Sequence, residues 1–151
     1  MIWWNEVAEV VSMLINTAAL VYGAITDYRH RLISDLVPVT LIGTGIVKIC
    51  HGAVWWPKVI AMLVVGTIVF VQIRPDDNNP PGGDFKLLSA MAFSDGLLTV
   101  LAVLLLTGLA ATIHGLLHKQ PMQRHIPLCT YAAPAYLAAC TVQIILFGGT
   151  L

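Results

Sequence analysis

Six apolar runs follow one another along the chain, separated by short polar stretches, and this alternation limits what the chain can fold into. The runs cover approximately Val7–Ile25, Leu36–Cys50, Trp55–Ile73, Phe85–Phe93, Leu97–Leu117 and Leu128–Phe147. A transmembrane helix needs about 20 apolar residues, so six crossings would take up most of the 151 residues. We therefore expect an all-α, polytopic membrane protein with one integral-membrane domain over residues 1–151, and no separate soluble domain.

The composition excludes a soluble domain and gives no support for nucleic acid or an anionic surface as a partner. Hydrophobic residues make up 58% of the chain and charged residues only 11%, whereas soluble domains are about 45–50% apolar and about 25% charged. The eight Lys and Arg residues balance the eight Asp and Glu residues. Without a net charge, nothing favours nucleic acid as a partner. The lipid bilayer is the partner that this composition predicts.

The short run Phe85–Phe93 decides the topology. If it crosses the membrane, six of the eight basic residues lie on one side, and if it only dips in, the two sides carry four each. Basic loops favour the cytoplasmic side, so we expect six transmembrane helices with the N-terminus outside. The cytoplasmic set is Arg29, Arg31, Arg74, Lys86, Lys119 and Arg124, and the outer set is Lys48 and Lys58.

The cysteines and histidines favour packing over metal binding. Cys50, Cys129 and Cys140 lie in or beside apolar runs and form no C-x-x-C pair, so we expect core packing without a disulfide or zinc. His114 and His118 share one helical face, but no Glu or Cys joins them at a suitable spacing. They are interpreted as interfacial histidines, and no metal or cofactor is expected.

Asp27 and Asp84 stand where polar loops meet apolar helices, and six crossings place both at the cytoplasmic face. Singly, each is an ordinary interfacial charge. Two neighbouring carboxylates share a proton, so one can act as general base on a water and the other as general acid. Gly82 and Gly83 would let a substrate strand approach Asp84. They equally suit a glycine turn into a helix whose first turn favours an acid, and the residues alone leave both interpretations open.

Two motifs resemble those of the type IV prepilin peptidases, which are intramembrane aspartyl proteases. The segment from Asp27 to Asp35, DYRHRLISD, is similar to their D-x-R-x-x-x-I-x-N signature, and PGGDFKL, from Pro81, is similar to G-x-G-D-x-K-L. Ile126-Pro127 and the residues 131–135 are similar to a weaker motif at the final helix. The resemblance implies that Asp27 and Asp84 are the catalytic dyad and that Gly83 is the glycine beside the second aspartate.

The resemblance also marks supporting positions and two departures. Lys86 and Arg29 match positions that the family uses, where a cation could lower the pKa of a carboxylate or anchor the topology. Asp35 stands where the family usually has Asn. It could compete with Asp27, but its place before an apolar run predicts a helix N-cap. Pro81 replaces the first glycine of the second motif and leaves Gly83 and Asp84 intact.

The implied activity is removal of the leader peptide from a prepilin, a substrate with a basic leader and a hydrophobic helix. The first run begins near residue 7 and no C-x-x-C occurs, which is similar to the short, peptidase-only form of Flp/Tad pilus systems. The expected location is the bacterial cytoplasmic membrane, with the site facing the cytoplasm. Two alternatives stay open: a non-enzymatic scaffold or transporter subunit, and a G-x-G-D protease that cuts other membrane helices. The Arg74–Gly83 loop is a candidate lid.

Overall fold

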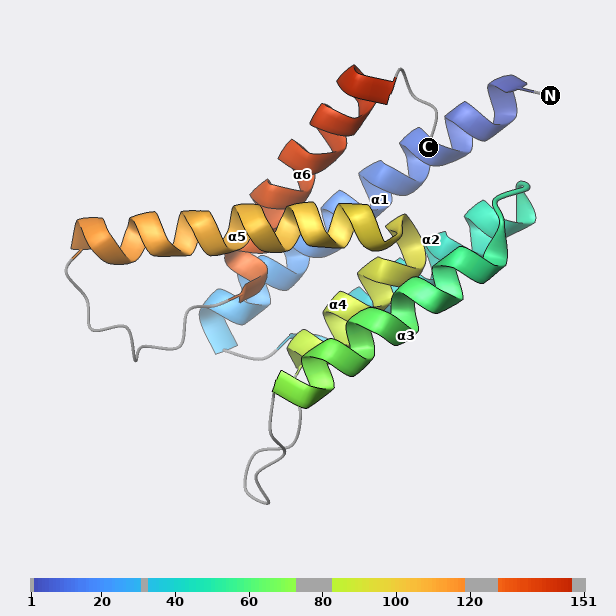
Figure 1. The fold of residues 1–151 in the computed structure, drawn as a ribbon. Coiled ribbons are helices and arrows are strands. Elements are labelled where there is room, and N and C mark those ends of the chain that lie inside the picture. Colours follow the sequence, from blue (N-terminus) through green and yellow to red (C-terminus); the bar gives the residue numbers. More distant parts are fainter. Residues whose placement is uncertain (1, 31–32, 73–82, 119–127, 148–151) are drawn as a thin grey trace.

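The computed structural model describes residues 2–30, 33–72, 83–118 and 128–147, which form six α-helices and contain no strand. The all-α fold class is therefore confirmed for these residues. The helices are α1 (Ile2–His30), α2 (Leu36–Cys50), α3 (Trp55–Gln72), α4 (Gly83–Asp95), α5 (Leu97–His118) and α6 (Leu128–Phe147) (Figure 1).

The helix bounds follow the apolar runs closely, because these runs are long enough for helices and are bounded by Gly, Pro and charged residues. The runs Leu36–Cys50 and Leu128–Phe147 match α2 and α6 residue for residue. The main difference lies in α1, which continues past the apolar run to His30. Asp27 is thus a helical residue in the last turns of α1. Of the candidate lid, only Gly83 is among the described residues, and it begins α4.

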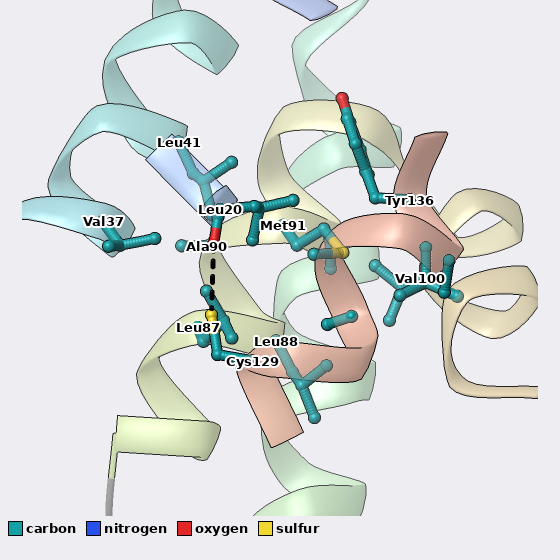
Figure 2. Packing of buried hydrophobic residues seen from close by; sticks show 14 of the residues in the cluster. Leu20, Val37, Leu41, Leu87, Leu88, Ala90, Met91, Val100, Cys129 and Tyr136 are labelled. Carbon is teal, nitrogen blue, oxygen red and sulfur yellow. Dashed lines mark hydrogen bonds between the residues drawn. The ribbon is translucent and has the colours of Figure 1, made fainter. Parts of the chain in front are cut away.

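Helix α4 forms the centre of the molecule. Six consecutive residues, 87–92, are all buried, and a helix that is apolar on every face belongs inside a bundle. It packs against α2, α3 and α5. Leu87, Leu88 and Met91 of α4 belong to the same hydrophobic core as Leu20 of α1 and Leu41 of α2, and Figure 2 shows these residues.

The connection between α4 and α5 is a single residue, Gly96. Its φ of +85° lies in the left-handed region that glycine adopts freely, and its N–H donates to the Ala92 carbonyl at 3.0 Å. The Lys58 ammonium of α3 donates to the Ser94 carbonyl at 2.7 Å. This end of α4 therefore finds its hydrogen-bond partners inside the protein. From Gly96, α5 leaves at a steep angle and packs across α6 (Figure 1).

Four helix ends meet at one end of the bundle. The C-terminal ends of α1 and α3 and the N-terminal ends of α4 and α6 gather at the lower left of Figure 1. Both segments that carry the sequence motifs, around Asp27 and around Asp84, lie here. The fold thus brings the two motifs to the same end.

Much of the outer surface is apolar. Val7–Arg29 and Leu97–Leu117 are long and apolar enough to cross a membrane, whereas Leu36–Cys50 and Trp55–Val71 are apolar but shorter. On α5, Leu98, Leu105 and Leu116 are each at least 75% exposed. Soluble monomers rarely leave such a continuous apolar surface uncovered, so the exposed faces favour a membrane protein.

The cysteine prediction is confirmed in part. All three cysteines are free, and Cys129 and Cys140 are buried, as expected. Core packing is wrong for Cys50, which is exposed because it is the last residue of α2.

Candidate active site

Asp27 is held between α1 and the beginning of α6. Its residue is 7% exposed, and its Oδ2 accepts a hydrogen bond from the backbone N–H of Cys129 at 3.1 Å. Cys129 is the second residue of α6. The first N–H groups of a helix have no partner within the helix and favour a negative charge nearby. The start of α6 therefore stabilises the ionised form of the Asp27 carboxyl.

A close approach of α1 and α6 makes this contact possible. A Cβ placed on Gly23, one turn before Asp27, would lie 2.8 Å from the Sγ of Cys129 and 3.1 Å from a methyl carbon of Val37. With glycine at position 23, the Cys129 thiol reaches α1 and donates to the Leu20 carbonyl at 3.7 Å, which is the dashed line in Figure 2. Gly23 thus leaves the space that the first turn of α6 occupies beside Asp27.

Asp84 lies in the first turn of α4, ahead of the apolar run 85–93, and part of its side chain is exposed. Burial by the surrounding protein, and after it the negative charge of Asp27, raise the pKa of Asp84 above that of an ordinary aspartate. Both carboxylates also act electrostatically on the Cys129 thiol. The two aspartates, 57 positions apart in the sequence, thus share one electrostatic environment.

Gly83 is required by packing. A Cβ on Gly83 would lie 2.8 Å from the Cβ of Ile33, which is too close for two carbon atoms, and neither atom can rotate away. The glycines with a positive φ among the described residues are Gly52 and Gly96, so an unusual backbone conformation is not the reason for glycine at position 83. Gly82 lies outside the described residues.

We expect Gly83→Ala to lower the rate of substrate processing at least about tenfold, because Ile33 would displace the first turn of α4 and Asp84 with it. Gly43→Ala is the matched control, since a Cβ there meets no atom within 4 Å. The measurement is the processing rate of each variant at equal membrane abundance. Equal rates for the two variants would contradict the packing role of Gly83.

Asp35 takes the predicted N-cap position of α2, but the capping hydrogen bond implied by that prediction is absent. Asp35 pairs instead with Lys86, Nζ to Oδ1 at 2.8 Å, and the two side chains are 76% and 58% exposed. The long Lys86 side chain reaches across from α4 and competes for the carboxylate. Such an exposed pair contributes at most about 1 kcal/mol to the free energy of unfolding.

The remaining supporting residues take ordinary positions. Lys86 contacts Asp35, and Arg29 is exposed at the end of α1, two residues after Asp27. Arg31, Pro81 and the Ile126-Pro127 pair lie outside the described residues. The structure therefore places Asp27 and Asp84 in one electrostatic environment, with Gly83 next to Asp84 in the chain, and leaves Arg29 exposed.

Sequence reasoning missed one contact of the site and one buried polar residue outside it. The contact from Cys129 could have been sought by asking which helix begins near the end of α1, since a helix start offers N–H donors. Asn16, a polar residue in the middle of the first apolar run, is completely buried. Its position signals a buried hydrogen-bonding partner, because an unpaired amide is costly in apolar surroundings.

Metal ligands do not gather in the described part of the chain. No group of three or more His, Cys, Asp or Glu side chains there could hold a metal ion. The ring of His114 packs edge-on against Tyr131, with 6.0 Å between the ring centroids.

Comparison with known proteins identifies the family. Searches among curated proteins and among solved structures found no match. The family model of the type IV leader peptidase family matches residues 14–116. This range holds both Asp27 and Asp84 and ends before α6, so the weaker motif at the final helix lies outside it. Because the match spans more than half of the chain, the chain belongs to the type IV leader peptidase family.

Proposed function

We propose that this protein is an intramembrane aspartyl endopeptidase that removes the leader peptide from Flp-type prepilins at the cytoplasmic face of the membrane. The observation that supports the proposal is that Asp27 and Asp84 lie at the same end of the bundle, near enough for the charge of Asp27 to act on Asp84. Membership of the type IV leader peptidase family supports the peptidase activity, and the two motifs support the aspartyl dyad.

The surroundings of the two carboxylates favour different roles. Burial disfavours a charge on both groups and is the larger effect at each. The Cys129 N–H partly offsets this effect at Asp27, whereas the charge of Asp27 adds to it at Asp84. We therefore assign the shared proton to Asp84. Asp27 is then the general base and Asp84 the general acid.

Hydrolysis follows from this assignment. Asp27 takes a proton from a water molecule as the water oxygen attacks the carbonyl carbon of the scissile peptide bond, which gives a tetrahedral oxyanion. Collapse of this intermediate breaks the C–N bond while Asp84 gives its proton to the departing nitrogen. The products are the leader, with a new carboxylate, and the mature pilin, with a new amine. Water supplies every atom that is added to the products, and transfer of a proton from Asp27 back to Asp84 restores the pair for the next turnover.

Six crossings with the N-terminus outside complete the proposal. The exposed leucines of α5 support contact with lipid, and α4, about 20 Å long at 13 residues, is shielded from lipid by the helices around it. This topology places the end of α2 at the outer face, and Cys50 is exposed there.

We expect a membrane-impermeant maleimide added to intact spheroplasts to label Cys50, because Cys129 and Cys140 are buried. The label should disappear in Cys50→Ser, the control for modification elsewhere. Labelling that requires disruption of the membrane would contradict the proposed orientation.

The direct test of the function is reconstitution of the purified protein in vesicles with a tagged Flp-type prepilin, followed by gel shift and N-terminal sequencing of the product. Cleavage at the junction between the basic leader and the hydrophobic helix supports the proposal. Cleavage of other membrane helices with the prepilin left intact would assign the protein to another substrate class. An intact prepilin after incubation with stably inserted protein would overturn the enzymatic proposal.

A further inference from the structure

A second group of polar side chains lies deep in the bundle, away from the two aspartates. It joins four helices, and we call it the interhelical polar network. Its members are Asn16 of α1, Thr44 and Lys48 of α2, Ser94 and Asp95 of α4, and Tyr136 of α6. Asn16, Ser94 and Tyr136 have no exposed surface at all.

Asn16 is the centre of this network. Its Nδ2 donates to Ser94 Oγ at 2.8 Å and to Asp95 Oδ2 at 3.0 Å. Its Oδ1 accepts from Thr44 Oγ1 at 2.7 Å. The carboxylate of Asp95 can only accept, so the amide must face it with its nitrogen. Asn16 thus connects α1 directly to both α4 and α2.

The remaining contacts of Asp95 close the network. Tyr136 OH donates to Asp95 Oδ2 at 3.0 Å, and Lys48 of α2 pairs with Oδ1. Each carboxylate oxygen is therefore already engaged by donors from neighbouring helices. A carboxylate bound in this way suits a structural contact between helices. It suits a proton carrier less well, because a proton carrier needs an oxygen that is free to exchange protons.

The spacing along α1 and α4 relates the interhelical polar network to Asp27 and Asp84. Eleven positions separate Asn16 from Asp27 on α1, and eleven separate Asp84 from Asp95 on α4. Eleven residues are close to three full turns, about 16 Å along the axis and within about 20° of the same face. Since α1 ends at the site and α4 begins there, the helices are antiparallel. Asn16, which binds Asp95, therefore lies on about the same face of α1 as Asp27, and Asp95 lies on about the same face of α4 as Asp84.

Apolar packing alone would fix this register weakly. The packing contacts of α1 are mainly with α2 and α6, and α2 in turn packs against α4. A shift of one residue moves a side chain by about 1.5 Å along the axis and about 100° around it. Such a shift would take the Asn16 amide away from Ser94 and Asp95 and leave it buried without these partners, which is costly in apolar surroundings.

From these contacts we propose that Asn16 is a positioning residue: by binding Ser94 and Asp95 it fixes the register of α1 against α4 and so holds Asp27 opposite Asp84. The role of the register in catalysis rests on the proposed peptidase function. The register itself can be measured without any cleavage.

The test compares wild type with Asn16→Leu in two measurements on protein in vesicles. The first is the distance distribution between spin labels at Tyr28→Cys and Lys86→Cys, beside the two aspartates on exposed positions, in a Cys50→Ser background. The second is prepilin cleavage by the unlabelled proteins. In Asn16→Leu we expect the distribution to broaden or shift. We also expect kcat to fall about a hundredfold with KM within about twofold, because a misplacement near 1 Å has effects of this size.

Thr17→Val is the matched control, because among the described residues the Thr17 hydroxyl bonds only the Met13 carbonyl of its own helix, at 2.8 Å. It should keep both the distance distribution and kcat. Rescue is tested by exchanging the amide and the carboxylate. Asn16→Asp and Asp95→Asn should each lower kcat, and the double variant should recover at least about tenfold over the weaker single variant, since a donor again faces an acceptor.

Several results would overturn the proposal. An unchanged distance distribution in Asn16→Leu would show that Asn16 does not set the register. A changed distribution with an unchanged kcat would show that the register does not matter to catalysis. A double variant no better than either single variant would place the effect outside the Asn16–Asp95 contact. Failure of wild type to cleave any prepilin would instead refute the proposed function, while the label distances would still decide the register.

Discussion

Asp27→Asn and Asp84→Asn should each lower the rate of prepilin processing by about 10²- to 10⁴-fold, the range that loss of general acid–base catalysis produces. Asparagine has nearly the shape of aspartate, and its Oδ1 can still accept the Cys129 N–H at position 27. It can neither take a proton from water nor give one to the leaving nitrogen. We therefore expect inserted, folded protein without activity, measured as the rate of leader removal at equal membrane abundance.

Asp35→Asn is the control for this prediction. Asp35 is a third carboxylate near the first motif, but it is 76% exposed and bound to Lys86. Its replacement should leave the rate within about twofold of wild type and change the free energy of unfolding by at most about 1 kcal/mol. A loss of activity in Asp35→Asn with activity retained in Asp27→Asn would transfer the catalytic role to Asp35.

The second large effect concerns stability. Lys48→Met should lower the free energy of unfolding by about 3–5 kcal/mol, because it leaves the Asp95 carboxylate buried without its cation. The two side chains are only 12% and 7% exposed, so water cannot replace the lost partner. The measurement is denaturant unfolding of the protein in detergent micelles, compared with wild type under the same conditions.

The double variant Lys48→Met/Asp95→Leu separates the cost of the unpaired charge from loss of packing. With both charges removed, the free energy of unfolding should recover most of the loss, since a buried ion pair can often be replaced by apolar side chains at little net cost. If the double variant is less stable than Lys48→Met, the ion pair is not the main contribution of Lys48.

The helices could be predicted from the sequence because each apolar run is close to a helix in length and is bounded by residues that end helices. Asp27 and Asp84 could be chosen because the two motifs name them. The contacts between helices could not be predicted, because they depend on which faces meet. Asp35 precedes a helix but is drawn to Lys86, which stands 51 positions later. Lys48 lies in an expected helix and counts in the sequence only as a basic residue of the outer face, and its pairing with Asp95 of α4 becomes visible only in the fold.

The short helix α4 has a consequence for biosynthesis. At about 20 Å it is shorter than a hydrocarbon layer of about 30 Å, so in the topology that we propose the turn at Gly96 would lie below the lipid headgroups. The Ser94 carbonyl there depends on the Lys58 ammonium in place of water. Lys58 belongs to the preceding helix and leaves the ribosome first. In each newly made chain, Lys58 is thus synthesised before the end of α4, whose Ser94 carbonyl it binds.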